Sequence, residues 1–189
     1  MSSRESKALA DFETLDWSEF SFRSIFNKIE QGRRLKKDDQ LSGTIPFVMA
    51  GATNTGVVNY ISNPVASFPA NSITVDIFGN TFYRNYAFGA GDDTDVYWND
   101  KTNYAENTML FFTTAMAKAL SGRFSYGKKL RSSQSFDLKM LLPAKDGKPD
   151  FSAMATLISA VQKLVIKNVA LYADRKIEAT KTVVAGNGR

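Results

Sequence analysis

The C-terminal part of the chain has a hydrophobic pattern of its own. From Asp150 to Lys181 it contains neither glycine nor proline, and apolar residues recur every three or four positions. This is the period of one face of an α-helix, and Asp150 is a typical N-cap residue. The pattern predicts one long helix over 150–181. Its a and d heptad positions are Met154, Leu157, Val161, Leu164, Asn168 and Leu171.

Such a helix exceeds the diameter of a small domain, since 28 residues at about 1.5 Å each extend about 42 Å. Its apolar face therefore requires a second helix, either from this chain or from a partner. Asn168, at an a position, would fix the register of such a pair. The alternative, in which the helix packs along its own domain, stays open at this stage.

The pattern before Asp150 is mixed. Residues 1–16 are polar and unpatterned, which predicts a loose lead-in. Phe20 and Phe22 then alternate as in a strand, and Ile25, Phe26 and Ile29 follow helical spacing. Gly32 is the predicted end of that helix.

Residues 43–100 favour β structure. The segment 71–80 alternates, with Ile73, Val75 and Ile77 on one face, and the Gly79–Asn80 pair predicts a turn. Aromatic residues are dense between 77 and 98; most are expected in the core or in cross-strand pairs, while some could stack on bases.

A helix over 104–121 ending near Gly122, a strand over 136–142 stopped by Pro143, and a turn at Asp146–Gly147 complete the pattern. The predicted fold class is therefore α+β. A β-rich globular domain over 17–149 precedes the long helix over 150–181 and a tail over 182–189.

Composition narrows the possible chemistry. The chain of 189 residues is 43% hydrophobic and 23% charged, which is typical of a soluble globular protein. It contains no cysteine and no histidine. Disulfides, cysteine nucleophiles, thiolate or imidazole zinc sites and serine–histidine triads are therefore excluded.

Carboxylates remain as candidate chemistry. Asp92, Asp93 and Asp95 could form a metal site or the acid–base pair of a hydrolase, but their spacing fits no EF-hand loop. The glycines at 89–91 lack the spacing of phosphate-binding loops. An acidic surface turn before the strand DVYW explains this segment better, so we expect no metal, no cofactor and no catalysis.

Positive charge is concentrated in two places. Residues 118–131 carry five basic side chains and no acidic one, which equals the net charge of +5 for the whole chain. A second cluster lies at 32–37. Either run alone is typical of a solvated loop, but two in glycine-containing turns favour a shared basic face and an anionic partner. Whether they meet in space stays open.

The N-terminus has no apolar signal-peptide core, and the chain has no fully apolar run of about 18 residues. This pattern predicts a cytoplasmic protein without a membrane partner.

Seven segments occur in an order that resembles the specificity (S) subunits of type I restriction–modification systems and the related target-recognition domains of type II systems. They are W-x-x-F…IF-x-x-I at 17–29, GRRLKKDD at 32–39, GTIPFVMAGATNTGVVNYI at 43–61, NSITVDIFGN at 71–80, FGAGDDTDVYW at 88–98, FSYGKKL at 124–130 and LLPAKDGKPD at 141–150. The long helix matches the spacer helix of that family. A full specificity subunit has two recognition domains and two spacer helices, whereas this chain has one of each.

The resemblance implies a non-catalytic subunit that recognises a DNA sequence for a separate adenine methyltransferase, and in some systems a nuclease. It implies a target-recognition domain followed by a spacer helix that forms a coiled coil, here with a second copy in a homodimer. Two identical halves would read an interrupted palindrome in double-stranded DNA. The alternative is a non-enzymatic β-rich module that binds carbohydrate or protein and oligomerises through the same helix.

Within this resemblance, chemistry suggests which side chains contact DNA. Those expected to neutralise phosphates are Lys36, Lys37, Lys128, Lys129 and Arg131. Those expected to read bases are Thr53, Asn54, Thr55, Arg84, Asn85 and Tyr86. For Asn54 and Asn85, ordinary turn chemistry is the alternative.

Overall fold

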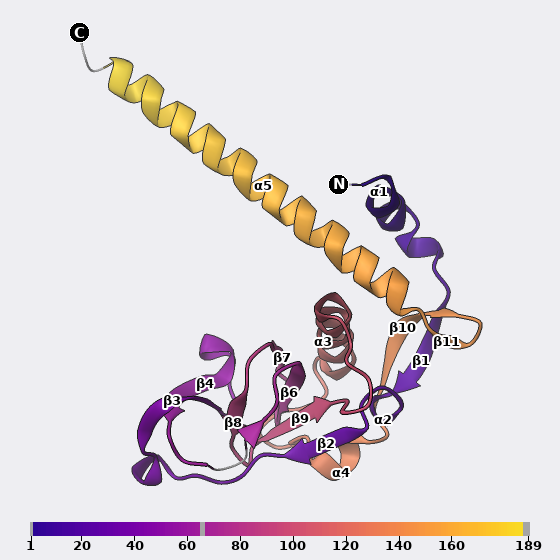
Figure 1. The fold of residues 1–189 in the computed structure, drawn as a ribbon, viewed down its shortest axis with the longest axis vertical. Coiled ribbons are helices and arrows are strands. Elements are labelled where there is room, and N and C mark those ends of the chain that lie inside the picture. The colour runs from indigo at the N-terminus through magenta and orange to yellow at the C-terminus, as the bar shows by residue number, and fades with distance from the viewer. Residues whose placement is uncertain (1, 65–66, 187–189) are drawn as a thin grey trace.

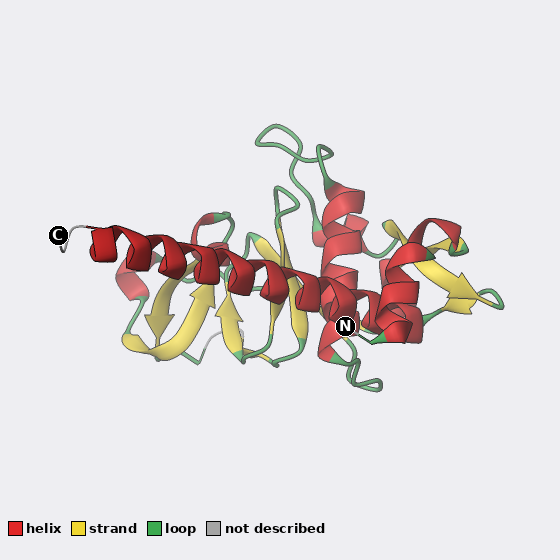
Figure 2. Cartoon of the chain, turned by 90° about the horizontal axis from the view of Figure 1, so that it is seen from above, coloured by secondary structure: helices red, strands yellow, loops and turns green. Residues whose placement is uncertain are grey.

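The chain forms a body of sheets and short helices from which one long helix projects (Figure 1). This computed structural model describes residues 2–64 and 67–186. The long helix is α5 (Phe151–Gly186). Figures 1 and 2 show that it leaves the body beside α3 (Glu106–Leu120) and extends over the side that carries β3 and β4.

The described part of the body contains three sheets. In the first, the order is β2 (Lys28–Gln31), β9 (Thr94–Trp98), β6 (Ser72–Asp76) and β7 (Thr81–Arg84), with every pair antiparallel. The second has the order β4 (Val57–Ile61), β3 (Ser42–Val48), β8 (Phe88–Ala90) and β5 (Ser67–Phe68), with β3 and β8 parallel. The third joins β1 (Trp17–Ser21), β10 (Lys139–Lys145) and β11 (Lys148–Pro149).

The main core lies between the first sheet and α3. Ile73 and Val75 of β6 are fully buried in it, as predicted for one face of this strand, although all five residues of β6 are buried. Ile77, predicted on the same face, lies beyond the end of β6 and is partly exposed. Phe112 and Met116 face β6 from α3, and Met154 adds the first turns of α5 to the same core. The structure therefore fixes the base of α5 rigidly to the sheet.

The predicted start of α5, the predicted end of α3 and the predicted turn at Asp146–Gly147 are confirmed. The backbone N–H of Ala153 donates to Asp150 Oδ1 at 2.9 Å, so Asp150 is the N-cap of α5. Gly122, which follows α3, has φ of 72°. Asp146 (φ 52°) and Gly147 (φ 73°) form the two-residue turn between β10 and β11.

Four expectations fail. The predicted helix over 25–32 is only α2 (Phe22–Ile25), because the next residues form β2 and pair with β9. Gly32 allows a close approach of two backbones, since a Cβ there would lie 2.2 Å from the carbonyl oxygen of Gly91. Pro143 does not stop its strand, because β10 continues to Lys145. Finally, α5 continues to Gly186, so most of the predicted 182–189 tail is helical; residues 187–189 lie outside the described residues.

The predicted loose lead-in contains the helix α1 (Ser3–Ala10), followed by the 3₁₀ turn η1 (Phe12–Thr14). Ser2 and Glu5 form a capping box, and the Glu5 carboxylate also accepts from Ser159 Oγ at 2.7 Å and Lys163 Nζ at 2.6 Å of α5. The hydrogen bond from Lys163, followed by those from Ser2 and Ser159, lowers the pKa of Glu5 to about 2. An eight-residue helix is weak in isolation, so its docking on α5 explains why it forms.

Candidate nucleic-acid interface

The two loops predicted to read bases lie side by side. The 3₁₀ turn η3 (Thr53–Gly56) and the end of β7 meet through Arg84, whose Nη1 donates to Thr55 Oγ1 at 3.0 Å and to the Tyr86 hydroxyl at 3.1 Å. Its Nη2 donates to the carbonyl oxygen of Thr55. Segments about thirty residues apart in sequence thus form one surface feature.

The position of Arg84 contradicts its predicted role. We predicted base contact, but the residue is 1% exposed, and its Nε donates to Thr74 Oγ1 at 3.1 Å. The guanidinium carbon lies 5.4 Å from the ring centroid of Phe82 and 6.0 Å from that of Phe88. Burial lowers the pKa of Arg84, and a side chain so enclosed is not placed to contact a base edge.

The turn is also held at its other end. Asp76, the last residue of β6, accepts from the backbone N–H of Gly51 at 2.9 Å. The same carboxylate accepts from the N–H groups of Phe78 (2.8 Å) and Asn80 (2.9 Å) and from Asn80 Nδ2 (2.7 Å), which closes the predicted Gly79–Asn80 turn. The sequence analysis assigned no site role to Asp76 or Thr74, whose bonds to Gly51 and Arg84 join segments that are apart in the sequence.

The backbone of η3 is unusual. Asn54 and Thr55 have φ of 47° and 53°, and Gly56 has φ of 84°. A β-branched residue rarely adopts the left-handed region, and such conformations persist where the surroundings enforce them. A Cβ at Gly56 would lie 2.7 Å from the carbonyl oxygen of Met49, so this position requires glycine.

The side chains at the tip face outward. Thr53, Asn54, Thr55, Asn85 and Tyr86 are all exposed. Asn54 Nδ2 donates to the carbonyl oxygen of Val57 at 3.2 Å, a local bond that is typical of asparagine in a turn. These five side chains remain predicted base contacts.

The two basic clusters meet at a groove of about 640 Å³. Lys36 and Lys37 from the first cluster and Lys129 from the second all line it. Lys129 Nζ also lies 4.8 Å from the ring centroid of Tyr126. Lys128 and Arg131 are exposed on the same segment as Lys129 but do not line the groove.

The groove also contains acidic and further basic side chains that the sequence analysis did not assign to it. Asp92 and Asp93 line it, and Arg34 Nη1 lies 3.8 Å from Asp92 Oδ2. The run GRRLKK is the sequence signal that could have identified Arg34. Over residues 2–64 and 67–186, no cluster of three or more metal-ligating side chains occurs.

Asp95 belongs to the strand DVYW that was predicted to follow the acidic surface turn, and not to the turn itself. It lies on β9 with 6% exposure, and its Oδ2 accepts from Ser135 Oγ at 3.1 Å. Burial raises the pKa of Asp95 to about 6, although the hydrogen bond from Ser135 opposes this shift. Asp95 thus lies inside the body, separate from the basic groove.

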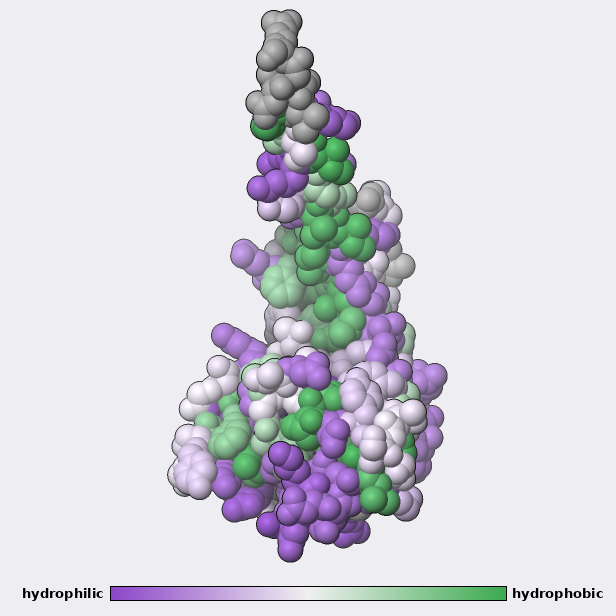
Figure 3. Space-filling model, turned by 90° about the vertical axis from the view of Figure 1, so that its left-hand side faces the viewer, coloured by the Kyte–Doolittle hydropathy of each residue, from purple (hydrophilic) through white to green (hydrophobic). Residues whose placement is uncertain are grey.

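The predicted partner face of α5 divides into two parts. Met154 and Leu157 pack against the body, with exposures of 0% and 4%. Ala160 is also buried, and α1 contacts the helix at Ser159 and Lys163. Apart from these contacts, the exposed apolar residues of the helix are Val161, Leu164, Val165, Ile166, Val169, Leu171, Tyr172, Ile177 and Val183. Figure 3 shows a hydrophobic stripe along the projecting helix, in contrast to the hydrophilic lower surface of the body.

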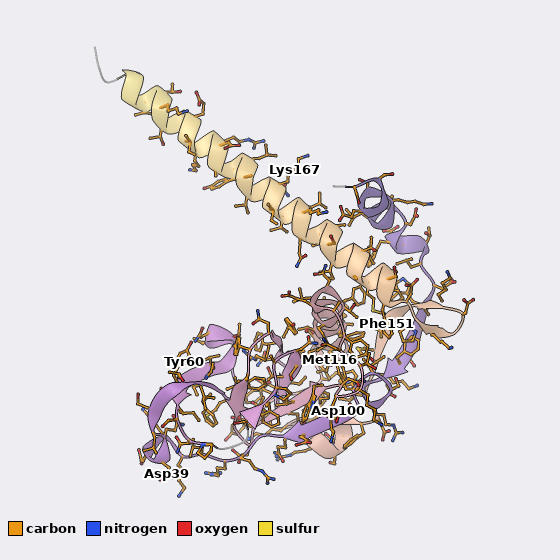
Figure 4. The ribbon with its side chains drawn as sticks, viewed as in Figure 1. Asp39, Tyr60, Asp100, Met116, Phe151 and Lys167 are labelled. Carbon is orange, nitrogen blue, oxygen red and sulfur yellow. The ribbon has the colours of Figure 1, made fainter. Side chains whose placement is uncertain are left out.

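This stripe leads into an apolar groove of about 910 Å³ at the base of α5. Trp17, Phe111 and Leu141 line it from the body, and Ile158 and Val161 line it from α5. In Figure 4, Phe151 marks the start of α5 and Lys167 lies about halfway along the helix. By length and composition alone, Phe151–Val183 is also apolar enough to cross a bilayer, with a mean hydropathy of 1.3 in its most apolar window.

Comparison with known proteins gives a consistent picture. The model of a family described as type I restriction modification DNA specificity domain matches residues 14–169. A curated relative, the specificity subunit of a type II restriction enzyme from Heyndrickxia coagulans, is 31% identical over 163 residues, which is 84% of this chain and 47% of the relative. The chain therefore spans about half the length of the curated relative it matches.

Solved structures share the fold at lower identity. The S subunit of a type I restriction–modification system from M. genitalium aligns with a TM-score of 0.61 and 18% identity, over 93% of this chain and 47% of that one. A chain from a structure of type I complex assembly aligns with a TM-score of 0.62 and 13% identity, over 90% and 47%. The HsdS subunit from Thermoanaerobacter tengcongensis aligns with a TM-score of 0.55 and 14% identity, over 86% and 43%.

Proposed function

The chain belongs to the type I restriction–modification DNA specificity domain family, and from this premise we propose that it recognises a DNA sequence on behalf of a separate methyltransferase. It performs no chemistry itself. The surface formed by η3, the end of β7 and the basic groove contacts the duplex.

One observation carries this proposal: basic residues from two distant segments line a single groove. Lys36, Lys37 and Lys129, with the exposed Lys128 and Arg131 nearby in sequence, would neutralise phosphates and supply affinity. Hydroxyl and amide groups at the tips of η3 and of the turn after β7 would read base edges. This division matches how proteins separate affinity from sequence choice on DNA.

The test is duplex binding as a function of salt, measured for the chain alone and with the methyltransferase that it is proposed to serve. Affinity is expected to fall steeply between about 50 and 200 mM salt, with a slope of about −0.9 per phosphate neutralised. The variant K128E/K129E should bind more weakly and lower the slope by about two.

A matched control is K145E/K148E on the β10–β11 hairpin, where both lysines are exposed and the change in net charge is the same. An equal loss of duplex affinity in both variants would mean that only the total charge of the chain matters. Absence of salt-dependent duplex binding, with and without the methyltransferase, would contradict the proposal.

For assembly, we propose that the part of α5 beyond Ala160 pairs antiparallel with a second copy and that the pair docks the modification subunits, together with a nuclease in systems that cleave. A helix fits this face better than a bilayer does, because Asn168 interrupts the stripe and five charged residues follow at 174–181. The expected location is the cytoplasm.

A further inference from the structure

Arg84 is the largest of the fully buried side chains in the described structure. Among the described residues no carboxylate forms an ion pair with it. Instead the charge is stabilised by hydrogen bonds to Thr74, Thr55 and Tyr86 and by two aromatic faces. Burying a cation costs free energy, so filling space does not by itself explain why an arginine is buried here.

The explanation lies in the direction of its hydrogen bonds. A guanidinium has donors and no acceptor, so Thr55 Oγ1 and the Tyr86 hydroxyl must both accept from Arg84. Each hydroxyl then keeps its own proton to donate elsewhere. The nearby positive charge polarises both hydroxyl groups and strengthens them as donors. Both residues are exposed, so these protons are available to a ligand.

We propose that Arg84 is a positioning residue that sets sequence specificity: it holds Thr55 and Tyr86 as outward hydrogen-bond donors, so that this turn selects bases with an acceptor in the major groove. Such acceptors are the N7 of purines, the O6 of guanine and the O4 of thymine. The exocyclic amines of adenine and cytosine are donors and are disfavoured there. This inference rests on the proposed function.

The geometry explains why arginine is required. Its Nε reaches Thr74 on β6, while Nη1 and Nη2 reach Thr55 on η3. Lysine has one nitrogen at the end of a flexible chain and cannot hold both partners in this planar arrangement. Because Thr55 has φ of 53°, loss of these bonds should release the turn.

The positioning role is tested first without DNA, by amide hydrogen exchange in the wild type and in R84K. Met49 N–H donates to the carbonyl oxygen of Gly56 at 2.9 Å, so this amide reports whether the turn is closed. R84K is expected to speed exchange over 49–56 by about tenfold or more, with exchange in α3 unchanged. Equal exchange over 49–56, or faster exchange everywhere, would overturn the positioning role.

The specificity role is tested by selecting bound sequences from a randomised duplex library with the chain and its methyltransferase. T55V and Y86F remove one donor each and are expected to lose preference at one or two positions, with about three- to tenfold weaker binding to the preferred duplex. T55S, which keeps the hydroxyl, should restore the preference. T102V makes the same atomic change as T55V at an exposed position outside this surface and serves as the control.

Base and phosphate acceptors are separated by replacing purines with 7-deazapurines in the preferred duplex, which removes N7 and leaves the phosphates intact. Where the preferred base is read through N7, the wild type is expected to bind the 7-deazapurine duplex more weakly. The variant that lacks the hydroxyl reading that base, T55V or Y86F, should bind the modified and unmodified duplexes equally. If the wild type selects a sequence but the hydroxyl variants select the same one equally well, the inference fails while the proposed function stands. If the wild type selects no sequence, both fail.

Discussion

Three charged side chains of the first sheet, Asp76, Arg84 and Asp95, are buried, and the protein accommodates Arg84 and Asp95 differently. Arg84, at the end of β7, has four hydrogen bonds and two aromatic neighbours. Asp95, on β9, accepts from Ser135, while the hydroxyl of the nearby Tyr97 has no hydrogen-bond partner among the described residues. Burial, with the charge of Asp95 as a lesser cause, raises the pKa of Tyr97. Protein groups therefore stabilise the charge of Arg84 well, whereas they stabilise the charge of Asp95 poorly.

This contrast predicts how stability depends on pH. The pKa of Asp95 is about 6 in the folded chain and 3.8 in its ordinary state, so its contribution is fully present below 3.8 and is lost as the pH rises through 6. D95N keeps an acceptor for Ser135 and removes the charge. Chemical denaturation should show D95N stabilised over wild type by about 2–3 kcal/mol at pH 8 and by less than about 1 kcal/mol at pH 4.

The control for this measurement is D146N, the same substitution at an exposed turn position. A D95N stabilisation of equal size at both pH values would show that charge burial at Asp95 is not its cause.

At the scale of elements, α5 combines two functions. Its first ten residues belong to the core, where Met154, Leu157 and Ala160 are buried. Farther along, α1 contacts one side of it through Glu5, Ser159 and Lys163. At about 100° per residue, Ser159 and Lys163 lie roughly opposite the stripe that passes through Val161 and Leu164. The N-terminal helix thus braces α5 and leaves the partner face open.

If that face pairs with a second helix, charges placed on it should prevent assembly. V161E/L164E is expected to weaken the dimer at least about a hundredfold, since burying each apolar side chain is worth about 1.5–3 kcal/mol. Analytical ultracentrifugation measures the assembly, and far-UV circular dichroism checks the fold.

Ala170 and Ala173 have the same spacing and lie on the far side of the helix, nine residues from each target. A170E/A173E therefore adds the same two charges and should leave the dimer intact. Sedimentation of V161E/L164E like the wild type would show that the stripe does not mediate assembly.

At the scale of the whole molecule, one body of sheets and short helices carries one long helix, and the chain spans about half of its curated relative. A two-fold pair of these chains would place two identical bodies at opposite ends of a helix pair. The part of α5 beyond Ala160, residues 161–186, is about 39 Å long at 1.5 Å per residue. This length is close to one turn of B-DNA, about 34–36 Å.

The expected target is therefore an interrupted palindrome whose half-sites lie about one helical turn apart. Selection from a randomised duplex library by the chain with its methyltransferase should return one half-site in two inverted copies. A single half-site, or two unrelated ones, would contradict a homodimer as the recognition unit. V161E/L164E should lose the spacing constraint and keep the half-site preference.

Most of the local structure could be predicted from the sequence. The start of α5 at its Asp150 cap, the helix α3, the strand β6 and the Asp146–Gly147 turn all follow from short-range signals. Two of the failures have one cause. Residues 28–31 became a strand, and α1 became a helix, because each gained a distant partner, β9 and α5 respectively.

For the candidate site, the sequence by itself determined the residue types: two basic runs, hydroxyl and amide side chains in glycine-containing turns, and the absence of histidine and cysteine. Only the tertiary structure decided how they combine. It brought Lys36, Lys37 and Lys129 into one groove, and it buried Arg84 beneath Thr55 and Tyr86. The physical reason is that charge and hydrogen-bonding capacity belong to a residue, whereas burial and partnership depend on strand pairing between segments far apart in the chain.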